Sequence, residues 1–386
     1  MSIQLTAQLG ILGLIVATLP LSIVWAATDA NKFRKLAAVT LFLTFDLIVF
    51  GAYTRLTDSG LGCPDWPGCY GHANPLLAHA DITAAEAAMP SGPVTVVKAW
   101  IEMIHRYLAM AVGVLIISLM VVAWRRWWLA RTAAGSARGR HQNSTSPWLP
   151  TFLLAFVCLQ GAFGAWTVTQ KLQPVIVTIH LMLGMGLLGL LAWLKSQQDV
   201  QPLPDARVAS LRWPAAAALG LLVIQIALGG WVSTNYAALA CTDFPLCHGE
   251  LVPTMDYAHG FALWRQLGMT AGGDYLPFAA LTAIHWTHRN FAFLVIAVVA
   301  WVALRAIKLP ATRRNAVWLL GAIGLQFLTG VLTIYLQWPL ALAVSHNAGA
   351  ALLVLLLVML NYRTFVAAGR TAAQPVAMTG RVLPTS

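Results

Sequence analysis

Four histidines occupy corresponding positions in the two halves of this chain, each inside an apolar segment. His105 and His288 both precede an arginine, and His180 and His346 both follow a glutamine at the same spacing. An ionisable side chain within a membrane span is costly and by default indicates a functional site. One such histidine could simply be hydrogen-bonded to a neighbouring helix, but four at matched positions favour a shared chemical role.

The arrangement predicts ligation of haem iron. Each half brings two histidines, on two different helices, to about 8–15 Å below the same surface. Imidazoles that face each other across a bundle suit axial coordination of a haem iron, whereas zinc would need three or four ligands per site. Nearby glycines would leave room for the macrocycle, although they also allow close helix packing; they are Gly161, Gly164, Gly184, Gly186, Gly330 and Gly349.

The two halves differ three residues before the first histidine, where one has Glu102 and the other His285. Residues at i and i+3 share a helix face, so Glu102 is expected to point toward the same pocket as His105. A carboxylate beside a metal site is a candidate acid–base group or charge stabiliser. The alternative is a glutamate at a helix start, favoured by the dipole. The difference suggests that the first pocket carries out chemistry and the second holds a cofactor.

Three further charged side chains lie within spans. Arg106 and Arg289 could pair with haem propionates or could extend to the membrane surface. Asp46 has no counterpart in the second half, and the sequence assigns it no role.

Four of the five cysteines form two pairs with the same internal spacing, Cys63/Cys69 and Cys241/Cys247. They lie in the two long loops, about 55–97 and 236–277, whose few lysines and arginines predict an extracytoplasmic side. Oxidising conditions on that side favour disulfides. The sequence leaves open whether these disulfides are structural or redox-active. Cys158 lies in a span and is expected to be a small core residue.

The elements that must position these residues are membrane-spanning helices. Hydrophobic residues make up 59% of the 386 residues and charged residues only 10%, which excludes a soluble globular enzyme and a nucleic-acid-binding protein despite the net charge of +11. Only helices and closed barrels satisfy the backbone in lipid, and the apolar segments lack the two-residue alternation of a barrel. The predicted fold class is therefore an all-α integral membrane protein.

Nine apolar segments approach the length of about 20 residues that a crossing requires. The first could be mistaken for a signal peptide, but the residues before it carry no positive charge, so we predict a retained helix. The predicted spans are 8–27, 34–54, 98–124, 150–170, 175–194, 213–235, 278–304, 315–336 and 340–362.

Lysine and arginine predict the orientation. Of the 24 lysines and arginines, 18 fall in alternate loops and in the C-terminal tail. These loops and the C-terminus are therefore predicted to be cytoplasmic. The N-terminus and the two long loops, about 55–97 and 236–277, are predicted to be outside.

The chain contains an internal repeat. The two cysteine pairs match at a single constant offset, the two His-Arg pairs are in register, and LQGAFGAWTVTQ resembles LQFLTGVLTIYL. Four spans separate equivalent positions, so the repeats are parallel and related by an axis along the membrane normal. We predict two tandem pseudo-symmetric four-helix bundles after one extra N-terminal transmembrane helix. The boundaries are 1–33 for the extra helix, 34–200 and 201–365 for the two units, and 366–386 for a cytoplasmic tail.

Several motifs together resemble the heme A synthase family of bacteria. They are TRLTDSGLG, CPDWPGCYG, EMIHRY, QGAFGAWTV and the repeated histidine spacings, and the likeness covers about 34–362. The family oxidises a ring methyl of heme O to a formyl group, by successive hydroxylation and loss of water, and supplies heme A to the terminal cytochrome oxidase. The resemblance implies an oxidoreductase of haem biosynthesis in the bacterial cytoplasmic (inner) membrane.

Carried onto this chain, the resemblance implies a haem b cofactor in the second unit, ligated by His288 and His346. It implies that the substrate heme O binds in the first unit, where His105 and His180 would flank its iron. Glu102 matches the functional glutamate of the family, and the loop cysteine pairs resemble those of its bacterial members.

Some points remain alternatives. His285 competes with His288 as a ligand, although the repeat aligns His288 with His105. The family plan needs eight spans, so the segment 8–27 is a departure.

Membrane lipid, heme O synthase and a quinone or other redox partner are the expected partners. A dihaem electron-transfer cytochrome would also use four histidines but has no need of Glu102, and a haem exporter or chaperone would use them as transient ligands.

Overall fold

A computed structural model of the protein describes residues 3–29, 31–132, 146–199 and 205–372. Within these residues the chain is helical, and its β-bridges are isolated pairs rather than strands. The helices are α1 (Ile3–Ala26), α2 (Lys32–Leu56), α3 (His79–Ala88), α4 (Val96–Thr132), α5 (Trp148–Thr169), α6 (Pro174–Gln197), α7 (Ala206–Ala209), α8 (Arg212–Thr234), α9 (Tyr257–Gly260), α10 (Phe278–Ala306), α11 (Pro310–Tyr335) and α12 (Leu340–Ala372).

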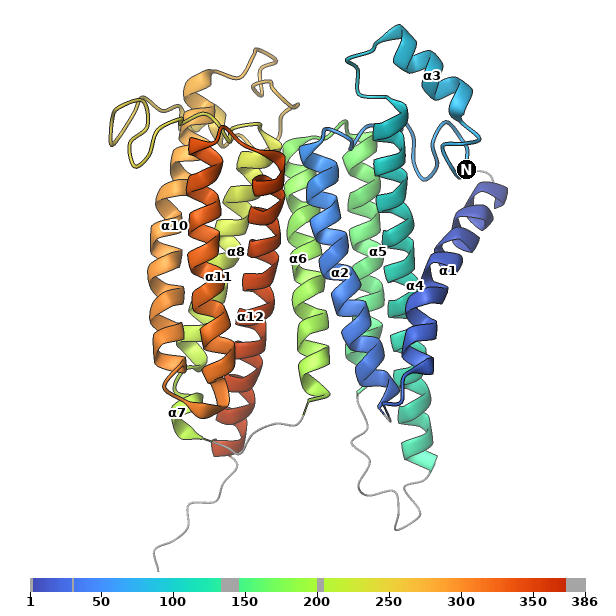
Figure 1. The fold of residues 1–386 in the computed structure, drawn as a ribbon, viewed down its shortest axis with the longest axis vertical. Coiled ribbons are helices and arrows are strands. Elements are labelled where there is room, and N and C mark those ends of the chain that lie inside the picture. Colours follow the sequence, from blue (N-terminus) through green and yellow to red (C-terminus); the bar gives the residue numbers. More distant parts are fainter. Residues whose placement is uncertain (1–2, 30, 133–145, 200–204, 373–386) are drawn as a thin grey trace, which may run out of the picture.

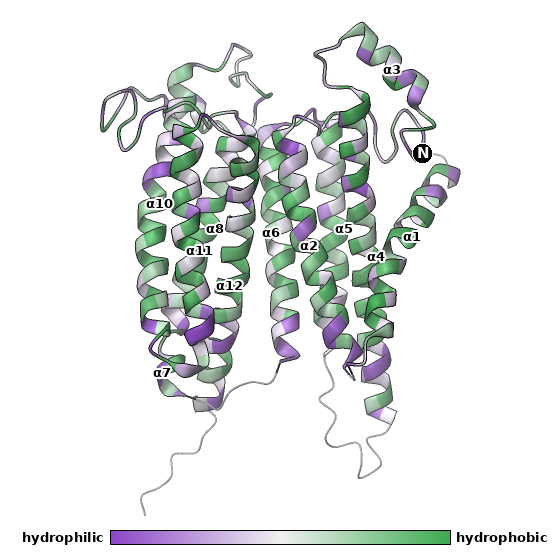
Figure 2. Cartoon of the chain, viewed as in Figure 1, coloured by the Kyte–Doolittle hydropathy of each residue, from purple (hydrophilic) through white to green (hydrophobic). Residues whose placement is uncertain are grey.

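In the described ranges, nine helical segments are long and apolar enough to cross a membrane, and each overlaps one predicted span. The short α7 leads into α8, and the two together form the sixth segment, Ala206–Thr234. Figure 2 shows apolar residues through the middle of the helices and hydrophilic residues mainly toward their ends. The all-α, multi-span fold class is therefore confirmed.

Two helices run eight or more residues beyond the ends of their predicted spans. α4 continues from residue 124 to Thr132 because no proline or glycine interrupts the basic and aromatic residues that follow the apolar stretch. α12 continues to Ala372, so the first residues of the predicted tail 366–386 are helical. Three predicted cytoplasmic or loop residues lie outside the described residues: Arg138, Arg140 and His141. The part 373–386 of the predicted tail, which includes Arg381, also lies outside them.

The long helices pack as two neighbouring groups of four (Figure 1). In the first group α2 contacts α4, α4 contacts α5, α5 contacts α6, and α6 returns to α2. In the second group α8, α10, α11 and α12 contact one another in the same cyclic order. We call these groups the first and second unit. They meet where α2 and α6 pack on α12 and where α6 packs on α8.

The additional helix α1 lies at the edge of the first unit against α4 and α2. A Cβ added to its Gly13 would come within 2.9 Å of Met110 Cβ on α4, so the two helices approach closely. Leu5 and Leu9 join the apolar cluster around Cys63 and Cys69. The helix therefore covers both α4 and the cysteine segment of the first long loop, residues 57–95.

Candidate functional site

The second unit encloses a cavity that both of its predicted ligands line. His288 on α10 and His346 on α12 share this cavity with Arg289 and with Phe293 of α10. Leu181 reaches the same cavity from α6 of the first unit. In the first unit, His105 on α4 packs on Gly51 of α2, and His180 on α6 packs on Gly164 of α5. The structure thus places the second-unit pair in one cavity and the first-unit pair on the two helices that both contact α2 and α5.

A glycine on the neighbouring helix accommodates each of the four imidazole rings. A Cβ at any of these glycines would come within 2.9–3.2 Å of a ring atom, which is closer than side chains normally pack. The same glycine–histidine contact therefore occurs twice in each unit. The pairs are Gly51 with His105, Gly164 with His180, Gly229 with His288, and Gly330 with His346.

The six glycines expected to leave room have different neighbours. Gly164 and Gly330 are two of the four that face a histidine. Gly184 and Gly349 instead lie against Gln160 and Gln326. A Cβ on Gly161 would meet open space, whereas one on Gly186 would meet Phe156. Of the six glycines expected to leave room, Gly164 and Gly330 are therefore the ones that contact a histidine ring.

Polar side chains hold both rings of the second unit. Gln225 Nε2 on α8 lies 3.1 Å from His288 Nδ1 and donates to the His288 carbonyl oxygen at 3.1 Å. On α11, Thr329 Oγ1 lies 3.0 Å from His346 Nδ1, and Gln326 Nε2 lies 3.2 Å from His346 Nε2. In the first unit, His180 Nδ1 is buried without a hydrogen-bond partner in the described residues.

These surroundings fit a haem group. Paired imidazoles from two helices supply axial nitrogen ligands, and the glycines let each histidine ring pack closely on a neighbouring helix. Arg289, which lines the cavity, keeps its Nη1 atom buried without a hydrogen-bond partner among the described residues. A guanidinium nitrogen in that state is available to a carboxylate such as a haem propionate.

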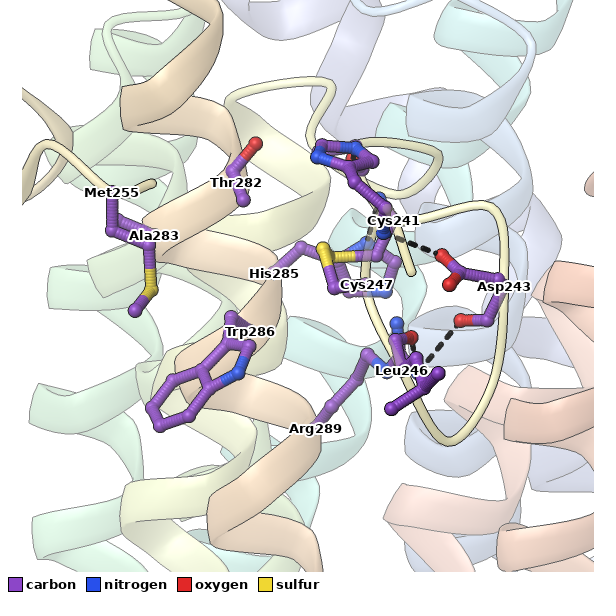
Figure 3. Close-up of a disulfide and its surroundings, with 12 residues drawn as sticks. Cys241, Asp243, Leu246, Cys247, Met255, Thr282, Ala283, His285, Trp286 and Arg289 are labelled. Atoms are coloured by element: carbon purple, nitrogen blue, oxygen red, sulfur yellow. Dashed lines mark hydrogen bonds between the residues drawn. A yellow bond between two sulfur atoms is a disulfide. The ribbon is translucent and has the colours of Figure 1, made fainter. Parts of the chain in front are cut away.

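Figure 3 shows the side chains of α10 that are hydrogen-bonded to the second cysteine loop. The Cys241 N–H donates to His285 Nδ1 at 3.1 Å, and Arg289 Nη2 donates to the carbonyls of Asp243 and Leu246. His285 is therefore engaged with the loop through one ring nitrogen, even though its side chain also lines the cavity.

Glu102 has the matching position in the first unit. Its Oε2 accepts a hydrogen bond from the Cys63 N–H at 2.7 Å, and its Oε1 pairs with Arg106 Nη2 at 2.5 Å. Arg106 also donates to the carbonyls of Asp65, Pro67 and Gly68 in the loop. Both arginines therefore bind loop carbonyls, rather than simply extending to the membrane surface.

Each cysteine loop also contains an aspartate that closes a tight turn. Asp243 accepts hydrogen bonds from the His248 and Gly249 N–H groups at 2.8 and 2.9 Å. These N–H donors, with Gly249 contributing most, hold the pKa of the Asp243 carboxyl below its usual range. Asp65 accepts the equivalent pair of bonds in the first loop, at 2.6 and 2.8 Å.

The predicted disulfides are confirmed, and one expectation about cysteine is wrong. Cys63–Cys69 and Cys241–Cys247 are bonded, with S–S distances of 2.11 and 2.05 Å. Cys158 is exposed rather than a core residue, because α5 turns that position away from its neighbours in the bundle. Asp46 is also exposed, on the side of α2 opposite its buried residues.

The sequence analysis missed the residues that support the histidines. Gln225, Thr329, Gly51 and Gly229 received no role, although the repeat contains the signal that identifies two of them. Gly51 and Gly229 are related by the same offset as the cysteine pairs. A search for equivalent small residues would have found them.

Known proteins provide an independent comparison. A family model described as cytochrome oxidase assembly protein matches residues 34–358. A protein of Shewanella oneidensis named heme A synthase is 36% identical over 329 residues, which are 85% of this chain and 95% of that protein. A Caulobacter protein of the same name is 31% identical, covering 82% of this chain and 91% of its own length. One from Rhodopseudomonas palustris is 28% identical, with coverages of 92% and 97%.

The family model extends through both units and includes His105, His180, His288 and His346, and it leaves out α1. With a family model over most of its length and a relative that is 36% identical along nearly its whole sequence, this chain belongs to the heme A synthase family of cytochrome oxidase assembly proteins.

Proposed function

We propose that this protein is a heme A synthase, an oxidoreductase that converts a ring methyl group of heme O to the formyl group of heme A. The observation that carries the proposal is the twofold occurrence of a histidine pair beside glycines, in a membrane protein of this family. One such pair would suffice for a simple haem-binding protein. Two pairs provide separate places for a cofactor and a haem substrate.

The second unit is the proposed cofactor site. His288 and His346 would hold haem b, and the free Nη1 of Arg289 would receive a propionate. His285 is less suited to be an axial ligand, because its Nδ1 accepts the Cys241 N–H bond and its ring is thereby tied to the loop. Haem b, when bound, supplies one-electron redox chemistry.

The first unit is the proposed substrate site. His105 and His180 would flank the iron of heme O and orient the porphyrin, and their helices exclude water from it. Glu102 lies one turn from His105, is buried and pairs with Arg106. It is the proposed catalytic residue, able to hold or accept a proton as the methyl carbon is oxidised.

The proposed location is the bacterial cytoplasmic membrane, with the long loops and N-terminus outside and the C-terminus in the cytoplasm. The support is the distribution of lysine and arginine, together with the placement of both long loops at one end of the bundle (Figure 1). Heme O synthase would supply the substrate. A quinone or another redox partner would accept the electrons that the oxidation releases.

Haem analysis tests the proposal. Protein purified after expression with a heme O source is expected to yield haem b together with heme O, a hydroxylated intermediate or heme A on reversed-phase separation. Haem b alone, near two per chain, would instead indicate an electron-transfer cytochrome. Sub-stoichiometric haem without any modified haem would indicate a transporter or chaperone.

A further inference from the structure

Thr329 selects the ring nitrogen of His346 that carries the proton. Its hydroxyl lies 3.0 and 3.1 Å from the carbonyl oxygens of Leu325 and Gln326, to which it donates its single proton. The same oxygen, 3.0 Å from His346 Nδ1, is left with lone pairs and accepts the Nδ1–H. His346 Nε2 then carries the lone pair, which is the state that iron requires. In the structure this lone pair faces Gln326 Nε2 at 3.2 Å, a contact that an iron ligand bond would replace.

Gln225 restrains His288 in a comparable way. Its amide contacts both the Nδ1 atom and the main-chain carbonyl of His288, so the rotation of the ring is fixed relative to its helix. Gln225 Oε1 is buried without a hydrogen-bond partner in the described part of the chain. A half-turn of the amide would let this oxygen accept a hydrogen bond from a protonated Nδ1, but it would remove the bond that Gln225 Nε2 donates to the main-chain carbonyl. The contact present in the structure is therefore a restraint on the rotation of the His288 ring.

The first unit lacks both side chains. In the alignment that pairs Cys63 with Cys241, Leu47 stands where the second unit has Gln225. In the alignment of α5 with α11 that pairs the two glutamines preceding the histidines, Phe163 stands where the second unit has Thr329. His180 Nδ1 is accordingly buried with no partner among the described residues, although the glutamine of α5 still lies beside the ring.

The His105 ring has a different neighbour. It stacks on Phe50 with ring centroids 6.3 Å apart, an apolar contact that offers the ring nitrogens no hydrogen-bond acceptor. The two units therefore share their glycines and histidines but differ in the groups that restrain the histidines.

We propose that Thr329 and Gln225 are positioning residues that make the second-unit histidines retentive haem ligands, and that Phe163 and Leu47 make the first-unit histidines exchangeable ones. The inference rests on the proposed function, because a cofactor must stay bound while a substrate must enter and its product leave. A hydrogen bond to the second ring nitrogen orients a metal-binding histidine and raises its basicity, and its loss typically weakens metal binding by about 10–100-fold.

Haem release from the second unit is the direct test. The full-length parent would carry His105→Ala and His180→Ala, so that only the second unit binds haem b. Thr329→Val, which keeps the branched shape, and Gln225→Leu, which installs the first-unit residue, are each expected to speed transfer of haem b to excess apomyoglobin by about 10–100-fold. The midpoint potential and low-spin absorption spectrum of the bound haem are expected to shift as well.

Thr44→Val is the matched control. Thr44 is a buried helical threonine whose hydroxyl donates to Thr40 O at 2.8 Å, and it has no hydrogen bond with a histidine in the described residues. Release at the parent rate is expected for this variant. Equal acceleration by Thr44→Val would show that any buried threonine has the same effect, and would overturn the assignment.

The reciprocal exchange keeps the proposal testable if Thr329→Val does not fold. In a parent carrying His288→Ala and His346→Ala, Leu47→Gln is expected to slow haem release from the first unit. Parent-like release in Gln225→Leu and Leu47→Gln alike would refute the inference. A His105/His180 double variant that binds no haem b at all would instead refute the cofactor site of the proposed function.

Discussion

At the scale of single residues, Glu102 and His285 have one structural role in common. Each accepts the main-chain N–H of the first cysteine in its loop, Cys63 and Cys241. The asymmetry between them is therefore one of charge rather than of position. Only Glu102 adds an ion pair, with Arg106, to that hydrogen bond.

Glu102→Gln separates these two roles. The amide oxygen can still accept the Cys63 N–H, whereas the negative charge and the proton-accepting capacity are lost. We expect unchanged haem b content and about 100-fold less heme A formed per haem b. The control is Glu86→Gln, since Glu86 likewise accepts one main-chain N–H, that of Val96, but lies on α3 between α2 and α4. Normal turnover in Glu102→Gln would rule out a catalytic role.

Two glycines of α8 offer a second residue-scale test. A Cβ on Gly229 would stand 2.9 Å from His288 Cε1, whereas one on Gly220 would meet nothing within 4 Å. Gly229→Ala is expected to displace the ring, cost about 1–3 kcal/mol and lower the haem b content. Gly220→Ala should be neutral or slightly stabilising. Thermal unfolding in detergent and the haem-to-protein ratio measure both, and equal behaviour of the two variants would contradict the role of Gly229.

At the scale of elements, the cysteine segments attach the long loops to α4 and α10. Each combines a disulfide, an aspartate-closed turn, an arginine bound to loop carbonyls and one acceptor on the helix. The helix residues concerned, Glu102 with Arg106 and His285 with Arg289, lie within one turn of His105 or His288. A substitution that displaces a loop is therefore expected to displace the helix that carries the proposed ligand.

The second loop should lose stability in acid. Folding lowers the pKa of Asp243, so its contribution is fully present above its unfolded value, about pH 4, and is lost as the pH falls through the lower folded pKa. Limited proteolysis of the loop across this range should show increased cleavage in the native protein. Asp243→Asn should be cleaved more readily already at neutral pH and show less change with pH. Identical pH profiles would contradict this role of Asp243.

At the scale of the whole molecule, the two units meet through equivalent residues. Arg55 Nη2 donates to Ser233 O at 2.8 Å, and Tyr236 OH donates to Asp58 Oδ1 at 2.6 Å. The Arg55 guanidinium also lies 4.3 Å from the centre of the Tyr236 ring. Both hydrogen bonds span the same sequence separation that relates the equivalent cysteines of the two units. Each therefore joins a residue to its own counterpart, as expected beside a pseudo-twofold axis.

Arg55→Met should weaken this contact between the units. The variant keeps much of the apolar stem but loses a charged hydrogen bond and the contact with the Tyr236 ring, so a loss of about 1–3 kcal/mol is expected. Arg207→Met is the comparison, because Arg207 forms an ion pair with Asp205 at the solvent-exposed surface, where such pairs contribute about 0–1 kcal/mol. Unfolding in detergent measures both variants. An effect of Arg55→Met no larger than that of Arg207→Met would contradict the inferred importance of the contact.

The sequence alone determined the all-α membrane fold, the nine spans, the disulfides and the matched positions of the histidines in the two units. These follow from length, composition and repetition, because lipid requires each span to satisfy its own backbone and a repeated segment tends to repeat its packing. The exposure of Cys158 and the extension of α4 were not predictable in this way. Exposure depends on which helices pack together, and apolar composition does not show where a helix ends in water.

Tertiary structure decided how the histidines are supported. Glycine–histidine contacts, the bonds from Thr329 and Gln225, and the common role of Glu102 and His285 all join different elements of the chain. Sequence spacing orders the residues along one helix, whereas these contacts depend on how neighbouring helices and loops are rotated and shifted against one another. That relative placement is set by packing across the whole bundle, so the groups that support the histidines of each unit are visible only in the folded chain.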